Sequence, residues 1–140
     1  MATPRETAEQ FFAAIEVGDV DRALGLLAAN VQFTSPGSDF DRAADVRHYL
    51  ETFVNAFPDA KFNVSRALES GSTVALEGVY GGTHTGPMRT PDGAEIPATG
   101  REAQAPFVTV FEVEDGQIIS HASYWDQLTF IGQLSLLPKA

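Results

Sequence analysis

The sequence predicts an α+β fold in which helices come first and an antiparallel sheet follows. Apolar residues recur at helical spacing in the first half of the chain, whereas residues 60–126 alternate with a period of two. A length of 140 residues fits one domain with a core of its own, and no internal repeat divides the chain. Segregated helices and antiparallel strands are typical of the α+β class. Residues 1–140 are therefore expected to form a single domain.

Four helices are expected. The first begins at Thr3, where Thr-Pro-Arg-Glu matches a capping box with proline at the first helical position. A Gly-Asp pair at 18–19 predicts its end and the start of a short second helix. The third begins near Asp41 and stops before Pro58. Apolar residues follow its helical period, namely Val46, Tyr49, Leu50, Phe53, Val54 and Phe57. A short apolar helix closes the chain after residue 126.

The second half of the sequence predicts the sheet. Alternating runs indicate strands at 60–69, 73–84, 103–114 and 117–126, and a brief strand is expected earlier, at 30–34. Between 84 and 103 lies the segment from Gly86 to Gly100, whose glycine and proline content argues against a regular element. Loops of this kind often carry function, so this segment is a candidate lid.

The last two strands are expected to form a tight hairpin. The Asp-Gly pair at 115–116 places residue 114 opposite 117. Uninterrupted pairing from that turn puts Phe107, Tyr124 and Asp126 on one face. It puts Trp125 and His121 on the other. Both faces are apolar, so we expect one to pack on the helices and the other on a second copy of the chain. The sequence thus predicts a homodimer through the sheet, with Trp125 in the interface.

Asp126 is the most unusual residue in this arrangement, because an unpaired carboxylate beside aromatic side chains is costly. One interpretation is an N-cap of the closing helix. The other is a general base whose pKa is raised by an apolar pocket. Strand order places His84 at the same sheet edge as Asp126, together with Arg101. A solvated strand-end histidine and a surface cation are the structural alternatives for these two residues.

Composition excludes several classes of function. Nine Lys and Arg against 19 Asp and Glu give a net charge of −10, which disfavours nucleic acid and anionic membranes as partners. The absence of cysteine excludes thiol chemistry and disulfides. The three histidines lack metal-ligand spacing, so no metal is expected. The N-terminus carries acidic residues where a signal peptide needs basic ones, which predicts a cytoplasmic protein.

An ordered set of motifs resembles the SnoaL-like polyketide cyclases, also called ester cyclases, of the nuclear transport factor 2-like superfamily. The motifs are Gly82-Thr83-His84-Thr85-Gly86-Pro87, Pro97-Ala98-Thr99-Gly100-Arg101, Val110 to Ile118, Tyr124-Trp125-Asp126-Gln127 and Gln133-Leu134. The resemblance implies a cone of three helices on a curved, mainly antiparallel sheet with an interior pocket and a dimer through the sheet. It also implies that Asp126 is the general base of an intramolecular aldol ring closure without cofactor or metal.

These observations predict a cofactor-independent cyclase or isomerase of a small polyketide-like or other hydrophobic carbonyl compound. Asp126 is the expected base, and His84, with Arg101 at the substrate, is expected to stabilise the enolate oxygen. The residues expected to line the cavity are aromatic: Phe33, Tyr49, Phe53, Tyr80, Phe107 and Tyr124.

Two alternatives remain at this point. The same cone can serve as a non-catalytic module that binds a hydrophobic ligand or dimerises. Epoxide hydrolysis of the limonene epoxide hydrolase type requires a second carboxylate facing Asp126, for which only Glu77 and Glu95 are candidates. Steroid isomerisation is not expected, because Ser35-Pro36 stands where the ketosteroid isomerases carry an Asp-Pro base.

Overall fold

The order of helices and strands follows the predicted α+β pattern in the computed structural model, which describes residues 2–89 and 93–136. The elements are α1 Pro4–Glu16, α2 Val20–Gly25, β1 Leu27–Ser35, β2 Ser38–Phe40, α3 Ala43–Ala56, β3 Lys61–Ser70, β4 Thr73–Thr83, β5 Met88–Arg89, β6 Glu95–Ile96, β7 Glu102–Glu114, β8 Gln117–Trp125 and α4 Gln127–Gln133. Among the described residues, no helix has both the length and the apolar character needed to cross a membrane.

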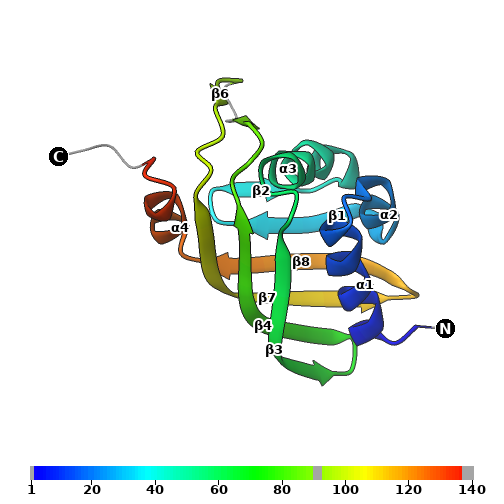
Figure 1. Ribbon diagram of the computed structural model, residues 1–140. Helices are drawn as coiled ribbons and strands as arrows, with labels where there is room; N and C mark the ends of the chain where they lie inside the picture. The colour runs from blue at the N-terminus through cyan, green and yellow to red at the C-terminus, as the bar shows by residue number, and fades with distance from the viewer. Residues whose placement is uncertain (1, 90–92, 137–140) are drawn as a thin grey trace.

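The main sheet has the strand order β2-β1-β8-β7-β4-β3. All neighbours are antiparallel except β1 and β8, which run parallel. Figure 1 shows α1 lying across the sheet, α3 beside β1 and β2, and α4 beyond the ends of β7 and β8. The predicted order of the four long strands is confirmed, and the curved sheet with its helices encloses a core rich in phenylalanine.

The helix starts follow the local sequence. Thr3 Oγ1 accepts a hydrogen bond from the Glu6 backbone N–H at 3.1 Å, and Glu6 Oε1 accepts one from the Thr3 N–H at 3.0 Å. This reciprocal pair satisfies two N–H groups at the start of α1, which confirms the predicted capping box. Asp19 caps α2 by accepting from the Arg22 N–H at 3.0 Å. Both caps could be predicted from the sequence because each depends on residues only three positions apart.

The candidate lid contains more regular structure than predicted. Met88 pairs with Ile96 and Arg89 pairs with Glu95 in a short antiparallel ladder, so the prediction of no regular element was wrong. Residues 90–92 of the predicted lid lie outside the described residues. The base of the segment is held by Gly86, whose N–H donates to the Ala56 carbonyl at 3.2 Å. A Cβ on this residue would lie 1.8 Å from a backbone oxygen of α3, so the approach requires glycine.

The β7–β8 hairpin differs from its predicted register. Glu114 pairs with Gln117 as expected, but a bulge at Ile119 leaves one residue of β8 without a partner. Phe107 therefore pairs with Trp125 instead of Tyr124. A shift of one residue moves side chains to the opposite face. The predicted faces of residues 120–125 were consequently wrong: Trp125 and His121 lie inside, and Tyr124 lies outside.

Candidate functional site

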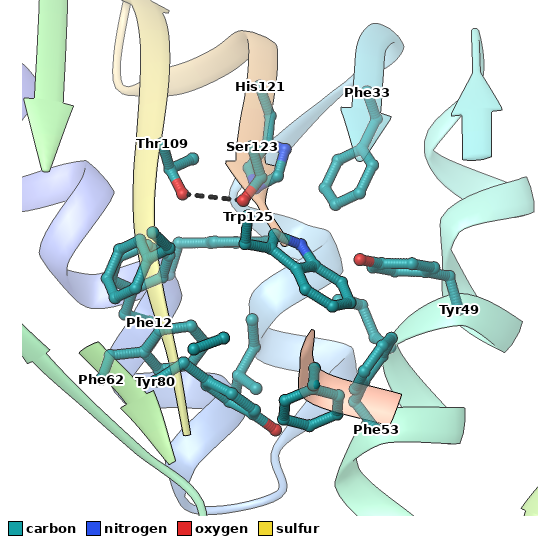
Figure 2. Close-up of a pocket in the computed structure, with 16 residues that line it drawn as sticks. Phe12, Phe33, Tyr49, Phe53, Phe62, Tyr80, Thr109, His121, Ser123 and Trp125 are labelled. Atoms are coloured by element: carbon teal, nitrogen blue, oxygen red, sulfur yellow. Dashed lines mark hydrogen bonds between the residues drawn. The ribbon is translucent and has the colours of Figure 1, made fainter. Parts of the chain in front are cut away.

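An aromatic pocket lies between α1, α3 and the inner face of the sheet (Figure 2). Its cavity has a volume of about 80 Å³. The lining residues come from helices and strands far apart in the sequence: Phe11, Phe12, Ile15, Phe33, Tyr49, Leu50, Phe53, Phe62, Tyr80, Ala105, Phe107, Thr109, His121, Ser123, Trp125 and Phe130. The sheet supplies one wall because alternate residues of β7 and β8 point inward.

The described lining contains no Asp, Glu, Lys or Arg. Its polar side chains are those of Tyr49, Tyr80, Thr109, His121, Ser123 and Trp125. An ionised ligand would lose its hydration here without meeting an opposite charge, which is strongly unfavourable. The pocket is therefore suited to an uncharged ligand.

Burial shifts the pKa values of the titratable groups in the lining, so that the tyrosines stay protonated and the histidine stays neutral. It raises the pKa of Tyr49 to about 12, against a smaller opposing effect of its hydrogen bond with Ser35. It also raises the pKa of Tyr80. Both hydroxyls therefore keep their protons at neutral pH. Burial lowers the pKa of His121 to about 4, against smaller opposing effects of hydrogen bonds with the His121 and Thr34 backbone, so its imidazole is neutral and one of its two ring nitrogens carries no proton.

His121 is held in place by aromatic rings. Its imidazole stacks on Phe33 with ring centroids 3.9 Å apart, and the edges of Phe11 and Phe111 lie at 5.7 and 5.3 Å. Its Nδ1 has no hydrogen-bond partner among the described residues, and neither has the hydroxyl oxygen of Tyr80. Buried polar atoms are normally hydrogen bonded. These two atoms are thus unsatisfied groups at the pocket wall, closed to solvent in this conformation.

The remaining polar groups of the pocket are paired. The Trp125 indole Nε1 donates to Ser35 Oγ at 3.2 Å, and Ser35 Oγ lies 2.6 Å from the Tyr49 hydroxyl oxygen. Thr109 and Ser123 share a hydrogen bond of 3.1 Å, drawn as a dashed line in Figure 2. Ser35 is itself buried, at the end of β1.

Asp126 does not lie in the environment that the sequence predicted. It is the exposed N-cap of α4, where Oδ1 accepts from the Thr129 N–H at 3.0 Å and Oδ2 accepts from the Thr129 hydroxyl at 2.6 Å. These hydrogen bonds hold the pKa of Asp126 below its ordinary value. The predicted apolar surroundings and raised pKa were wrong, because the bulge turns this end of β8 by one position. The capping interpretation describes what Asp126 does in the structure.

His84 follows β4 and lies at the same end of the sheet as Asp126, as strand order predicted, but outside the pocket lining. It is fully buried, and its Nδ1 accepts a hydrogen bond from the Thr99 N–H at 3.2 Å, with the Thr99 hydroxyl 3.0 Å away. Burial lowers the pKa of His84, partly offset by the Gly86 backbone. Arg101 is exposed and is also absent from the described lining. The structure thus brings neither residue to the cavity.

Five of the six predicted aromatic residues line the pocket, namely Phe33, Tyr49, Phe53, Tyr80 and Phe107. The sixth, Tyr124, is 63% exposed on the outer face of the sheet. Sequence reasoning missed His121, Trp125 and the α1 side chains. The apolar stripe of α1 was a usable signal for the last of these, whereas nothing in the alternation of β8 reveals its bulge. Among the described residues, no three His, Asp or Glu side chains are grouped as a metal site requires.

Comparison with known families identifies the fold and its relatives. Residues 8–121 match the model of the SnoaL-like domain family, and the chain belongs to this family. A comparison with curated proteins found no match. The resemblance inferred from the motifs is therefore confirmed at the level of the family and its nuclear transport factor 2-like fold.

Solved structures with this fold come from several bacteria. A candidate SnoaL-like polyketide cyclase from Jannaschia sp. CCS1 has a TM-score of 0.80 at 19% identity, covering 96% of this chain and 93% of that one. IdmH, a candidate polyketide cyclase from Streptomyces antibioticus, has a TM-score of 0.76 at 23% identity and covers 96% and 99%. An LEH-like epoxide hydrolase from M. tuberculosis has a TM-score of 0.71 at 19% identity and covers 94% and 89%. At these identities the likeness shows the fold alone.

Proposed function

We propose that the protein is a cofactor-independent cyclase or isomerase that acts on a small, uncharged, hydrophobic carbonyl compound in the aromatic pocket. The observation that carries this proposal is the composition of the described lining, which combines aromatic walls, protonated tyrosines and a neutral histidine with no charged side chain. The occurrence of candidate polyketide cyclases among proteins of the same fold supports the reaction class.

The proposed proton acceptor is His121. Its free lone pair takes a proton from the carbon next to the carbonyl, the C–H electron pair forms a carbon–carbon double bond, and the carbonyl electrons move onto oxygen. A tyrosine hydroxyl of the lining donates a hydrogen bond to that enolate oxygen. The enolate then attacks a second carbonyl carbon, and the alkoxide that forms takes the proton back from the His121 imidazolium. Where a second double bond is conjugated to the enolate, the imidazolium instead returns the proton to the far carbon, which shifts the double bond. A carboxylate base with a pKa of about 4.6 deprotonates a carbon acid in a known isomerase, so a pKa of about 4 is compatible with this role.

Ligand entry requires the aromatic side chains to move. The cavity of about 80 Å³ is roughly half the volume of an engineered cavity of about 150 Å³ that accepts benzene. A ring-sized ligand therefore displaces lining side chains. The same displacement gives it access to His121 Nδ1 and the Tyr80 hydroxyl, which are closed to solvent without a ligand.

The pocket argues against epoxide hydrolysis. That chemistry needs facing carboxylates, and the described lining has none. Glu77 pairs with Arg66 at 3.4 Å, outside the pocket, and Glu95 is exposed in β6. The role of Asp126 as a base stays a prediction, and it competes directly with the role proposed for His121.

Deuterium exchange separates these two bases. Cyclohexanone is neutral, apolar apart from its carbonyl, and carries hydrogens next to it that exchange with D₂O when an enolate forms. Proton NMR should show faster exchange with the wild-type protein than with buffer. His121→Phe keeps an aromatic ring at this position but removes the base. The rate of protein-catalysed exchange should therefore fall by about 10²–10⁴-fold. Asp126→Asn, which preserves an N-cap, should leave the rate unchanged.

The opposite pattern, with loss of exchange in Asp126→Asn only, would refute the role of His121. Binding of cyclohexanone without any accelerated exchange would favour the non-catalytic ligand-binding module instead. Cyclohexanecarboxylate has the same ring with a negative charge, and the proposal requires that it does not compete for the pocket at neutral pH.

A further inference from the structure

We infer that Ser35 orients the hydroxyl of Tyr49 so that the pocket selects ligands with an oxygen acceptor beside α3. This inference rests on the proposed function and adds the hydrogen-bonding specificity of the same pocket. It is carried by the chain of hydrogen bonds from Trp125 through Ser35 to Tyr49.

The direction of the first bond in this chain is fixed by chemistry. The indole nitrogen of Trp125 is a donor only, so Ser35 Oγ must accept at 3.2 Å. A serine hydroxyl has one hydrogen and two lone pairs. After the bond from Trp125, Ser35 Oγ retains one lone pair and its own hydrogen for the contact with Tyr49 at 2.6 Å.

Two arrangements of hydrogens satisfy the contact between Ser35 and Tyr49. In one, Tyr49 donates to Ser35, which leaves the serine hydrogen without an acceptor. In the other, Ser35 donates to Tyr49, which leaves the tyrosine hydrogen free. The described residues provide no third partner for Ser35 Oγ, whose residue is 7% exposed and does not line the cavity. Tyr49 does line it.

A ligand with an oxygen acceptor selects the second arrangement. Such a ligand meets the free hydrogen of Tyr49, and all groups of the chain are then satisfied, from Trp125 through Ser35 and Tyr49 to the ligand. Hydrogen bonds linked head to tail strengthen one another in a low-dielectric interior. A ligand that offers only a hydrogen-bond donor at this point binds less tightly. Tyr49 must then donate its own hydrogen bond to Ser35, which leaves the serine hydrogen without an acceptor.

The position of Tyr49 places this donor near the proposed base. Its ring lies 5.6 Å from that of Phe33, on which His121 stacks. Figure 2 shows the Tyr49 hydroxyl on the side of the pocket formed by Trp125, with His121 beyond it on β8. A carbonyl oxygen bound by Tyr49 thus lies on the same wall as the group proposed to remove the proton. Tyr49 is a ligand-binding residue in this account, and Ser35 is a positioning residue.

Two ligands of the same shape test the inference. Cyclohexanone has an oxygen acceptor, and methylenecyclohexane has a CH₂ group in its place. Affinities are measured by NMR titration of the wild-type protein, Ser35→Ala, Tyr49→Phe and the double variant. Ser65→Ala removes an exposed serine hydroxyl that donates to the Glu77 carbonyl at 3.2 Å, outside the pocket, and serves as the matched control.

Tyr49→Phe should weaken cyclohexanone binding about threefold to tenfold, the usual effect of one neutral hydrogen bond, and leave methylenecyclohexane unchanged. Ser35→Ala should weaken cyclohexanone less than this, and should have no further effect when Tyr49 is already Phe. If Ser35→Ala does not fold, the two ligands with Tyr49→Phe still test the donor.

Several results would overturn the inference. Equal weakening of both ligands by Ser35→Ala would show that Ser35 acts on pocket shape. An undiminished effect of Ser35→Ala on cyclohexanone in the Tyr49→Phe background would show that Ser35 does not act through Tyr49. Failure of the proposed function is distinct from these outcomes. Binding of cyclohexanone without accelerated exchange would overturn the catalytic proposal and leave the inference about Tyr49 in place, whereas no binding of either compound to the wild-type protein would overturn both.

Discussion

The aromatic pocket and the sheet edge that carries Asp126 use polar side chains in different ways. At the edge, both carboxylate oxygens of Asp126 accept hydrogen bonds from Thr129, and His84 Nδ1 accepts one from Thr99. In the pocket, His121 Nδ1 and the Tyr80 hydroxyl have no partner among the described residues. His84 Nε2 at the edge has none either, but His84 lies outside the cavity lining, so only the two pocket groups lie where a ligand can reach them. Groups that already complete local structure are less available for a ligand. The comparison therefore favours the pocket as the place where a substrate is recognised.

Three consecutive residues illustrate the difference. Tyr124 points outward from the sheet, Trp125 lines the pocket, and Asp126 caps α4. Their environments follow from the bulge at Ile119, which sets the facing of every later residue in β8. Variants of these three residues therefore test separately the outer face of the sheet, the pocket and the sheet edge.

The largest effect on stability is expected from Trp125→Ala. Its indole packs against Phe53 and Phe130, with ring centroids at 6.2 and 5.5 Å, so truncation leaves a void. Loss of a fully buried aromatic side chain costs about 3–5 kcal/mol of unfolding free energy, and Trp125 is partly buried, so a loss near the lower value is expected. Tyr124→Ala, on the exposed face, should cost no more than about 0.5 kcal/mol in the monomer. Urea denaturation of monomeric samples measures both, and a larger loss for Tyr124 than for Trp125 under those conditions would contradict the bulged register.

The next effect is a pH dependence of stability caused by His121. In the unfolded chain this histidine takes up a proton below its ordinary pKa of 6.5, whereas in the folded protein burial keeps it neutral down to about pH 4. The unfolded state binds more protons between these values, so stability should fall with acidification by at most about 3 kcal/mol. Denaturation across this range should show a smaller fall for His121→Phe.

His84 contributes to the same fall, because burial also lowers its pKa. The informative quantity is therefore the difference between the wild-type protein and His121→Phe. His48 is exposed on α3, and His48→Gln is the control for the removal of a histidine. An identical pH dependence in wild type and His121→Phe would indicate that His121 is not buried as a neutral group.

The homodimer predicted from the sequence stays a prediction, but the residues that test it have changed. Trp125 lies inside the monomer, whereas Tyr124 is exposed next to Val108 on the outer face of the sheet. Tyr124→Arg should place an unpaired charge in that interface and shift a micromolar sample from dimer to monomer. Sedimentation velocity measures this shift. A wild-type monomer under the same conditions would contradict the prediction.

The smallest effect is expected at Asp126. Asp126→Ala removes the cap of α4 and should lower the melting temperature slightly, whereas Asp126→Asn should restore it, because asparagine caps a helix as well as aspartate. Folding lowers the pKa of Asp126 below its ordinary value of 3.8. The contribution of its charge to stability is therefore fully present above about pH 3.8 and is lost as the pH falls through the pKa of the folded state. Thermal unfolding at neutral pH that ranks Asn below Ala would contradict a capping role.

Much of the fold was predictable because its signals are local. The capping box at Thr3 depends on residues three positions apart, and the stripe that contains Tyr49 and Phe53 follows the helical period. These two residues were placed in the pocket correctly for that reason. Strand order could be inferred because two hairpins connect neighbouring strands.

The site was less predictable, since it depends on the facing of one strand. An apolar run such as residues 117–126 pairs equally well with or without a bulge, and the bulge reverses which residues point inward. His121 was assigned to the outer face on this account, and Asp126 was given apolar neighbours that it does not have. The cap itself was predictable, because Asp126 and Thr129 are three positions apart, whereas the exposure of Asp126, which decides between cap and base, depends on the facing of β8.

The central claim is that a neutral hydrophobic carbonyl compound binds in the aromatic pocket and not at the sheet edge. Trp125 is the only tryptophan of the chain, so its indole N–H, which donates to Ser35 in the pocket wall, gives a single indole signal in a ¹⁵N–¹H spectrum. Titration with cyclohexanone should shift this signal and leave the backbone amides of Thr129 and Thr99, which report on Asp126 and His84, in place. Shifts of these two amides with an unchanged indole signal would contradict the account.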